Sequence, residues 1–118
     1  MITHYQDIPN YITKDGSSIR ELMHPDSHGN FNQSLAEATV PTGTQTQLHL
    51  HKESEEIYYI TRGQGVMTLG NEQLQVCRGD SILIAPNTPH QIMNNCDEDL
   101  IFLCVCSPAY SHQDTILL

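Results

Sequence analysis

The chain has 118 residues and a mass of 13.3 kDa, the usual size of a single domain and enough to bury its own core. Its 5 Lys and Arg against 14 Asp and Glu give a net charge of −9, which disfavours a nucleic-acid backbone or an anionic membrane surface as partner. No apolar run is long enough to cross a membrane and no secretory leader is recognisable, so we expect a cytoplasmic protein.

Short segments with alternating apolar and polar residues dominate the chain from residue 34 onward. Successive side chains of a strand point to opposite faces, so this period of two predicts β-strands. The predicted strands cover residues 34–40, 45–52, 57–60, 66–69, 73–77, 81–85, 90–94 and 100–106. Seven or more short strands separated by turns are typical of an all-β sandwich or barrel. We therefore expect one domain over residues 1–118, with N-terminal strands or an arm (1–33), a barrel core (34–106) and a tail (107–118).

The two ends of the chain are less regular. Proline and glycine interrupt every periodic window of the first 33 residues, where segment 17–23 fits a short helix or a strand equally well. The tail begins after a strand-ending Pro108 and finishes with apolar residues. It is either a loose or partner-packed terminus, the usual state of chain ends, or a segment that folds over the barrel mouth with Tyr110 or His112 as a lid.

The predicted strand that contains His49 and His51 has one polar face and one apolar face. The two histidines share their face with Gln47, whereas Leu48 and Leu50 lie on the other. In a plain sandwich the leucines face the core and the histidines face water. In a barrel with a polar lumen the histidines point inward, and a second layer or a partner chain covers the leucines. The strand by itself leaves both arrangements open.

A block of regularly spaced residues surrounds this strand. Gly43 is followed by His49, His51, Glu56 and Gly63 in the pattern G-x5-H-x-H-x4-E-x6-G. Two imidazoles at positions i and i+2 of a strand point in one direction, and a carboxylate on the next strand can join them. This arrangement of side chains is suited to holding a metal ion.

A second block runs from Gly79 to Asn94 and includes Ala85, Asn87 and His90. Together the two blocks resemble the two conserved motifs of the cupin superfamily. The family usually has Pro and Gly where this chain has Ala85 and Asn87. Asn tolerates a positive φ better than other non-glycine residues, so we expect the geometry of this turn to survive.

The resemblance implies a cupin-type jelly-roll β-barrel of two antiparallel sheets, with one divalent transition metal (Mn, Fe, Ni or Zn) per chain. By match to the motifs, the metal ligands are His49, His51, Glu56 and His90. Glu55 competes with Glu56 because the family allows three or four intervening residues, but the six-residue interval to Gly63 favours Glu56. Three neutral imidazoles and one carboxylate leave a divalent ion with a net charge of about +1 and, if it is six-coordinate, about two open positions.

Several further residues are candidates for the surroundings of the metal. Gln47 and Tyr58 fall beside the ligands by strand parity and can orient a substrate or a bound water, although Tyr58 fits core packing equally well. Cys104 and Cys106 share one face of the last predicted strand. If that face points inward, one thiol approaches the metal, but buried cysteines are more often simple small hydrophobic residues.

The other cysteines and histidines carry no clear chemical signal. We expect all four cysteines to be free thiols, because no secretion signal is recognisable and their spacing matches no common zinc site. Four histidines fit neither block and are expected to be ordinary surface or hydrogen-bonded residues: His4, His24, His28 and His112.

Two classes of function remain open. The first is a metal-dependent enzyme acting on a small oxygenated organic molecule, similar to the family's dioxygenases and oxidases with Fe or Mn, or to its isomerases with Zn or Ni. A phosphosugar is a poor substrate candidate because the chain has only 5 Lys and Arg. The alternative is a non-catalytic module that binds or senses a metal or small ligand, and a vestigial site is a third reading.

A homodimer is the expected assembly. Leu48 and Leu50 form one apolar face that needs a cover, and Ile101, Leu103 and Val105 form an apolar stripe on the last predicted strand. Such faces are buried when sheets or N-terminal strands pair between two copies of a chain.

Overall fold

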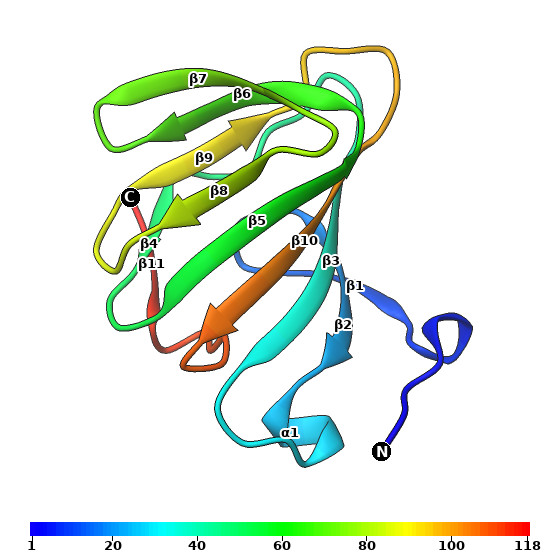
Figure 1. The fold of residues 1–118 in the computed structure, drawn as a ribbon. Coiled ribbons are helices and arrows are strands. Elements are labelled where there is room, and N and C mark those ends of the chain that lie inside the picture. The colour runs from blue at the N-terminus through cyan, green and yellow to red at the C-terminus, as the bar shows by residue number, and fades with distance from the viewer.

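The computed structural model describes all 118 residues, which form two antiparallel sheets packed face to face (Figure 1). The six-stranded sheet contains, in order, β1 (Asn10–Ile12), β2 (Ser18–Met23), β3 (Ser34–Val40), β10 (Leu100–Ser107), β5 (Glu55–Arg62) and β8 (Ser81–Ile84). The five-stranded sheet contains β11 (Thr115–Leu117), β4 (His49–His51), β9 (His90–Met93), β6 (Gln64–Leu69) and β7 (Glu72–Cys77). The prediction of an all-β chain with two antiparallel sheets is confirmed.

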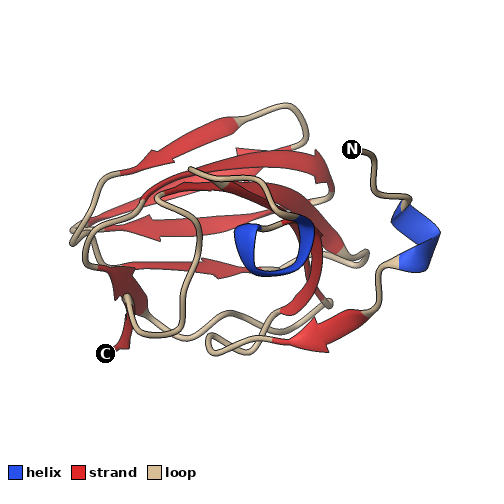
Figure 2. Ribbon diagram, turned by 90° about the horizontal axis from the view of Figure 1, so that it is seen from below, coloured by secondary structure: helices blue, strands red, loops and turns tan.

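Helical structure is limited to two short segments near the N-terminus. The 3-10 helix η1 (Tyr5–Asp7) stands to one side of the sheets, as Figure 2 shows, and α1 (Pro25–His28) connects β2 to β3. Gly29 ends α1 in a left-handed conformation with φ of 81°. No helix of the structure is both long and apolar enough to cross a membrane.

Strand β10 is central to the six-stranded sheet and sets the inward face of its neighbours. It pairs with β3 on one side and with β5 on the other, so that Cys104 lies opposite Ala36 and Tyr58. Because side chains alternate along a strand, Phe102, Cys104 and Cys106 all point between the sheets. The two cysteines therefore lie on the inward face.

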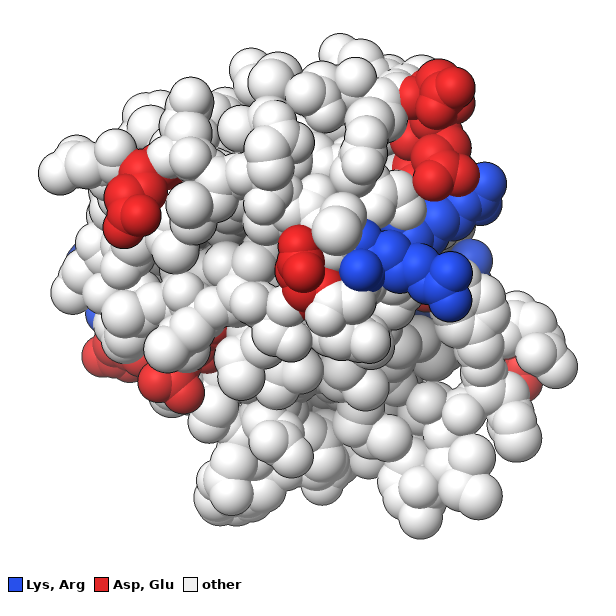
Figure 3. Space-filling model, turned by 45° about the horizontal axis from the view of Figure 1, so that its top comes forward, with Lys and Arg blue, Asp and Glu red and all other residues white.

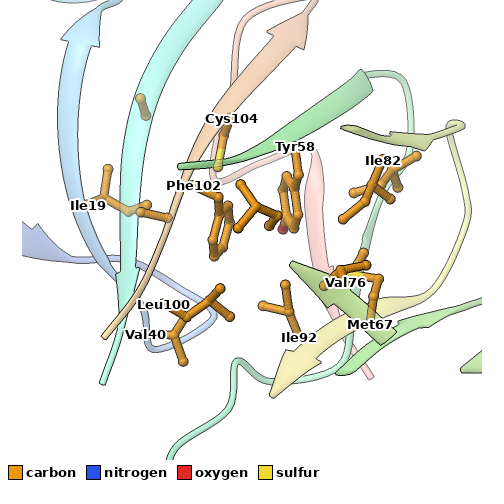
Figure 4. Close-up of a cluster of buried hydrophobic side chains, with 14 residues drawn as sticks. Ile19, Val40, Tyr58, Met67, Val76, Ile82, Ile92, Leu100, Phe102 and Cys104 are labelled. Atoms are coloured by element: carbon orange, nitrogen blue, oxygen red, sulfur yellow. The ribbon is translucent and has the colours of Figure 1, made fainter. Parts of the chain in front are cut away.

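The hydrophobic core lies between the sheets and is supplied mainly by the six-stranded one (Figure 4). Its buried side chains are Ile19, Ala36, Ala38, Val40, Tyr58, Ile60, Met67, Val76, Ile82, Ile84, Ile92, Leu100, Phe102 and Cys104. The five-stranded sheet contributes Met67, Val76 and Ile92 to it. Full burial of a side chain such as Phe102 contributes about 1.5–3 kcal/mol to stability. Leu69 of the same sheet is partly buried against the core, and the other buried side chains of this sheet are polar: His49, His51, His90 and Thr115.

Strand β4 resolves the question of which face of the 45–52 segment points inward. His49 and His51 are buried between the sheets, and Leu50 is half-buried on the opposite side. The regular strand is shorter than predicted, because Gln45 forms only an isolated bridge with Met93 before the chain leaves the ladder. The backbone N–H of Gln47 donates instead to the carbonyl of Asp15.

Both ends of the chain form strands that pair with the rest of the fold. Segment 17–23 is strand β2, paired with β1 and β3, rather than a helix. The favoured view of the tail as a loose or partner-packed terminus is wrong, because β11 pairs with β4 of the same chain and occupies its open edge. Lys14 also donates from Nζ to the carbonyls of His112 and Thr115, which fastens the tail to the β1–β2 turn.

The turn before β9 keeps its geometry despite the two departures from the motif. Asn87 adopts a left-handed conformation with φ of 62°, as expected for the residue that replaces Gly. Its backbone N–H donates to the carbonyl of His51 over 2.7 Å. The turn therefore holds the end of β4 in place.

Gly63 and Gly70 differ in how much space the surrounding backbone leaves for a side chain. Both have positive φ, but a Cβ at Gly63 would lie 2.6 Å from the carbonyl oxygen of Asp99, whereas one at Gly70 meets nothing within 4 Å. We expect Gly70→Ala to lower the free energy of unfolding by about 1–2 kcal/mol through backbone strain alone. Gly63→Ala should cost about 1–3 kcal/mol more, because backbone must move. Urea unfolding measures both, and equal losses would contradict the predicted collision.

Candidate metal centre

Three histidines from two neighbouring strands meet between the sheets. His49 and His51 come from β4, and His90 opens β9, where its backbone pairs with that of His49. The ring centroids of His49 and His90 are 4.1 Å apart, and that of His51 lies 5.2 Å from His49 and 5.3 Å from His90. All three side chains are buried, and one ligand atom from each lies within 4.8 Å of the others. The cluster has the dimensions needed to surround a metal ion.

Hydrogen bonds at Nδ1 fix which nitrogen each ring offers. Nδ1 of His49 lies 2.7 Å from the carbonyl of Gln47, and Nδ1 of His90 lies 2.9 Å from the carbonyl of Thr88. A carbonyl can only accept, so each Nδ1 carries a proton and donates it. Nε2 of a neutral ring then keeps its lone pair, which is the form that binds a metal.

His51 reaches the same state through a side chain. Its Nδ1 lies 3.0 Å from Oγ1 of Thr115 on β11. The hydroxyl of Thr115 donates its only proton to the carbonyl of Ser111 over 2.8 Å, so towards His51 it must accept. Nδ1 of His51 is therefore the donor, and Nε2 is free to face the other rings.

Glu56 of β5 completes the group from the facing sheet. Its Oε1 lies 3.1 Å from Nε2 of His51 and 3.4 Å from Nε2 of His90. Its Oε2 accepts a hydrogen bond from Sγ of Cys106 over 3.2 Å, which holds the carboxylate in this orientation. Glu55, the competing glutamate, is exposed.

The charges in the group require a positive charge at its centre. Nε2 of His51 and Oε1 of Glu56 both present lone pairs across 3.1 Å, so they repel each other unless a proton or a cation lies between them. Burial by itself raises the pKa of Glu56, but the adjacent imidazoles of His51 and His90 outweigh it and lower the pKa to about 2. Glu56 is an anion at any physiological pH.

The residues present fit a divalent transition metal. Glu56 Oε1 and His90 Nε2 are buried and have no hydrogen-bond partner within the protein. Unsatisfied buried polar atoms are costly, and a cation bound to both would satisfy them. Three imidazoles and one carboxylate are donors that Mn, Fe, Ni and Zn all accept.

Asp15 is a further acid at this site that the sequence did not reveal. It lies in the turn between β1 and β2, is buried, and places Oδ2 3.6 Å from Nε2 of His49. Its Oδ1 accepts from the backbone N–H and the hydroxyl of Ser17. The irregular first 33 residues contain no motif that could have placed it here.

A cavity opens beside the site and is lined by three of the four donors, His49, His51 and Glu56. Tyr58, Cys104 and Cys106, expected near the metal, all line it. Burial and then the charge of Glu56 raise the pKa of both thiols, so they are protonated and poor nucleophiles. All four cysteines of the chain are free.

Gln47 does not line this cavity, contrary to expectation. Its side chain is exposed, while that of Thr46 is buried. The segment before β4 is not a regular strand, so the alternation counted back from His49 does not hold there. Gln47 contributes through its carbonyl, which accepts from His49.

The C-terminal tail covers the cavity with Tyr110. Its ring lies edge-on to His51 with the centroids 5.9 Å apart, and its hydroxyl is 3.1 Å from Oγ1 of Thr13. Two other histidines serve this segment: Nε2 of His24 bonds to the Tyr110 carbonyl over 2.7 Å, and Nδ1 of His112 to the Tyr110 hydroxyl over 3.0 Å. His4, His24, His28 and His112 all lie outside the metal cluster.

Comparison with known proteins identifies the fold and several relatives. The family model for the cupin domain matches residues 36–106, more than half of the chain. The uncharacterized protein MJ1618 of Methanocaldococcus jannaschii is 55% identical over 116 residues, covering 98% of this chain and 93% of that protein. An oxalate-binding protein of Thermotoga maritima is 33% identical over 86 residues, covering 73% and 67%. The crystal structure of a predicted oxalate decarboxylase from Thermotoga maritima superposes with a TM-score of 0.80 and 25% identity, covering 92% and 99%.

Acidification should destabilise the metal-free protein. Burial first, and then the neighbouring His90, lower the pKa of His49 below 6.5, against the opposing effects of the hydrogen bond to the Gln47 carbonyl and of Asp15. The unfolded chain takes up this proton near pH 6.5 and the folded chain does not, so the free energy of unfolding falls as the pH drops below 6.5. One proton gives a slope of up to about 1.4 kcal/mol per pH unit. Protonation of Glu56 lowers the free energy of unfolding further as the pH falls from 4.5 towards its folded pKa of about 2.

Urea unfolding of the chelator-treated protein between pH 7 and pH 5 measures this slope. The His49→Gln variant should be flatter than the wild type, because it has no proton to take up at this position. The matched variant His4→Gln changes an exposed histidine and should keep the full slope. An unchanged slope in His49→Gln would contradict the assignment.

Proposed function

The chain belongs to the cupin family, and we propose that it is a metal-dependent enzyme acting on a small, oxygen-bearing organic molecule. The observation that carries the proposal is the convergence of three buried imidazoles and one carboxylate beside a cavity. The side chains that would hold one divalent Mn, Fe, Ni or Zn ion are His49, His51, Glu56 and His90. When bound, such an ion supplies a Lewis acid and, in the case of Fe or Mn, a centre that exchanges electrons with O2.

The protein's own part is to orient these donors and to exclude water. The acceptors at Nδ1 keep the three Nε2 lone pairs pointed at one place, and Cys106 keeps Glu56 turned towards them. The core residues and Tyr110 surround the cavity, which strengthens electrostatic interactions within it. Two reaction classes suit this arrangement: oxidation or dioxygenation with Fe or Mn, and isomerisation with Zn or Ni.

A binding module without catalysis is the second candidate function. It is favoured by the relative named as an oxalate-binding protein, which is 33% identical over 73% of this chain. In that case the ion would fasten the two sheets together and fix a ligand for recognition only. Turnover separates the two candidates, because their metal sites are the same.

Metal content tests the ligand set. We expect about one Mn, Fe, Ni or Zn per chain in tag-free protein analysed by plasma mass spectrometry. His51→Ala should lose about 90% or more of it, because ligand loss lowers affinity at least as much as the 10–100-fold typical of outer partners. His4→Ala removes an exposed histidine and should retain the metal. A wild-type protein that takes up none of these metals would contradict the proposal.

Oxygen consumption tests the reaction class in the metal-loaded protein. Uptake in the presence of an enediol, a diketone or a catechol, lost in His51→Ala, would support an oxygenase or oxidase. Isomerisation of a hydroxycarbonyl compound without oxygen uptake would support the Lewis-acid class. Tight binding across this panel without turnover would favour the binding module.

The outer face of the six-stranded sheet supports the proposal of a homodimer. Ile57 lies between Val105 and Leu83 in the register of β10, β5 and β8, and all three point away from the core. The side chains of Leu83, Tyr59 and Ile57 are 60%, 45% and 40% exposed. A contiguous apolar surface of this kind is normally covered in solution, and a second copy of the sheet would cover it.

Light scattering at micromolar concentration tests the assembly. We expect a particle of twice the chain mass of 13.3 kDa. Leu83→Lys places a charge in the apolar surface and should shift the particle to a single chain. Leu74→Lys changes a comparably exposed leucine on β7, in the other sheet, and should leave the dimer intact. A wild-type monomer would overturn the proposal.

A further inference from the structure

The cavity beside the metal centre carries negative charge and no positive side chain. Three carboxylates line it: Asp15, Glu21 and Glu56. No Lys or Arg is among its lining residues. Recognition of carboxylates and phosphates normally relies on Arg or Lys, often in bidentate pairs. This cavity has the opposite electrostatic character.

Each basic residue of the chain is engaged or exposed elsewhere. Lys14 Nζ is bonded to the carbonyls of the tail, Arg20 Nη1 to the carbonyls of Tyr5 and Ile8, and Arg62 Nε lies 3.5 Å from Glu98. Lys52 and Arg78 are exposed. Figure 3 shows basic side chains gathered beside acidic ones on the outer surface. None of these five basic side chains is part of the cavity wall.

Two polar groups of the cavity wall have unused hydrogen-bonding capacity. Tyr58 is 3% exposed, lies with its ring centroid 6.1 Å from that of His90, and its hydroxyl makes no hydrogen bond. Glu21 Oε1 is buried without a partner, although Oε2 accepts from the hydroxyl of Tyr11 over 3.0 Å. The wall thus offers one free donor and one free acceptor.

The protonation of these groups defines their roles. A phenol hydroxyl carries its proton at neutral pH, so the hydroxyl of Tyr58 can donate a hydrogen bond to a ligand in the cavity. Glu21 offers a carboxylate oxygen and so needs a donor. A ligand that satisfies both carries at least one acceptor oxygen and one hydroxyl or N–H group.

The remaining wall is apolar and the cavity is narrow. Ile19, Ala36, Ala38 and Phe102 line its other sides. It has about 40 Å³ of space for the centres of water-sized molecules, room for roughly three waters at about 10–15 Å³ each. A molecule of a few non-hydrogen atoms matches this volume.

We propose that the cavity binds a small hydroxylated molecule without negative charge, which accepts a hydrogen bond from Tyr58 and donates one to Glu21. This inference rests on the proposed function, since it names the substrate class of the same site. A divalent ion held by Glu56 would carry a net charge of about +1, and the carboxylates of Asp15 and Glu21 would outweigh it, so the loaded cavity keeps a net negative charge. An anion in this water-poor cavity would be repelled by that excess negative charge. Dianions such as oxalate and sugar phosphates are therefore poor ligands, in contrast to what the relative's name would lead one to expect.

Two probes of the same size and shape isolate the effect of charge. Glycolamide and glycolate both have a hydroxyl and a carbonyl oxygen, but only glycolate is an anion. We expect zinc-loaded, nitrogen-15-labelled protein to bind glycolamide about tenfold or more tightly than glycolate, measured by chemical-shift titration. Oxalate should bind more weakly still. The inference is overturned if either anion binds as tightly as glycolamide, or if glycolamide does not bind.

Two conservative substitutions test the proposed contacts of Tyr58 and Glu21 with the ligand. Tyr58→Phe removes only the hydroxyl and should weaken glycolamide binding by about three- to tenfold. Glu21→Gln removes one charge and should narrow the preference for glycolamide over glycolate by a similar factor. Neither residue is among the four metal donors, so both variants should keep their zinc. Variants with full zinc content and wild-type affinities would overturn the assigned contacts.

The zinc content of the same samples separates this inference from the proposed function. If the protein holds about one zinc per chain but binds glycolate more tightly than glycolamide, the inference about ligand charge is wrong and the proposed metal site is supported. Protein that takes up no zinc rejects the metal site. The charge comparison is then made on the metal-free chain, where the same carboxylates face the probes and the same preference is expected.

Discussion

The site depends on how the three buried imidazoles are oriented. Each ring gives its Nδ1 proton to an acceptor supplied by a neighbouring backbone or by Thr115, which leaves the three Nε2 lone pairs directed at one place. Lone pairs brought together in a low-dielectric interior repel one another and the carboxylate of Glu56, so the arrangement stores unfavourable energy until a cation relieves it. Strands β4, β5 and β9 hold the four donors together in the folded chain, so the proposed metal would find them already in place.

The two sheets divide the work between packing and chemistry. The six-stranded sheet provides eleven of the fourteen core side chains, whereas the five-stranded sheet provides Met67, Val76, Ile92 and the three histidines. The interior therefore has an apolar region, whose burial stabilises the fold, and a polar region, whose burial costs free energy. Strands β4 and β9 can carry histidines between the sheets because most of the core is built by their neighbours.

Alternation along short segments was enough to predict the all-β fold. The resemblance of two local blocks to the cupin motifs brought His49, His51, Glu56 and His90 into one proposal. Asp15, Glu21 and Thr115 could not be found in this way. They reach the site through pairing between strands that are far apart in the chain, and the segments that hold them show no periodic pattern. Gln47 was misplaced for a related reason, because parity fails where a strand becomes irregular.

The cavity is assembled from two parts of the chain with different relations to the family. All four proposed metal donors lie within residues 36–106, the span that the cupin family model matches. Asp15, Glu21, Tyr110 and Thr115, which close and charge the cavity, lie outside it. Substitutions in these flanking segments can alter which molecule is accepted while the metal donors stay the same. Ligand choice therefore depends in part on residues outside the family span, and a shared domain says little about a shared ligand.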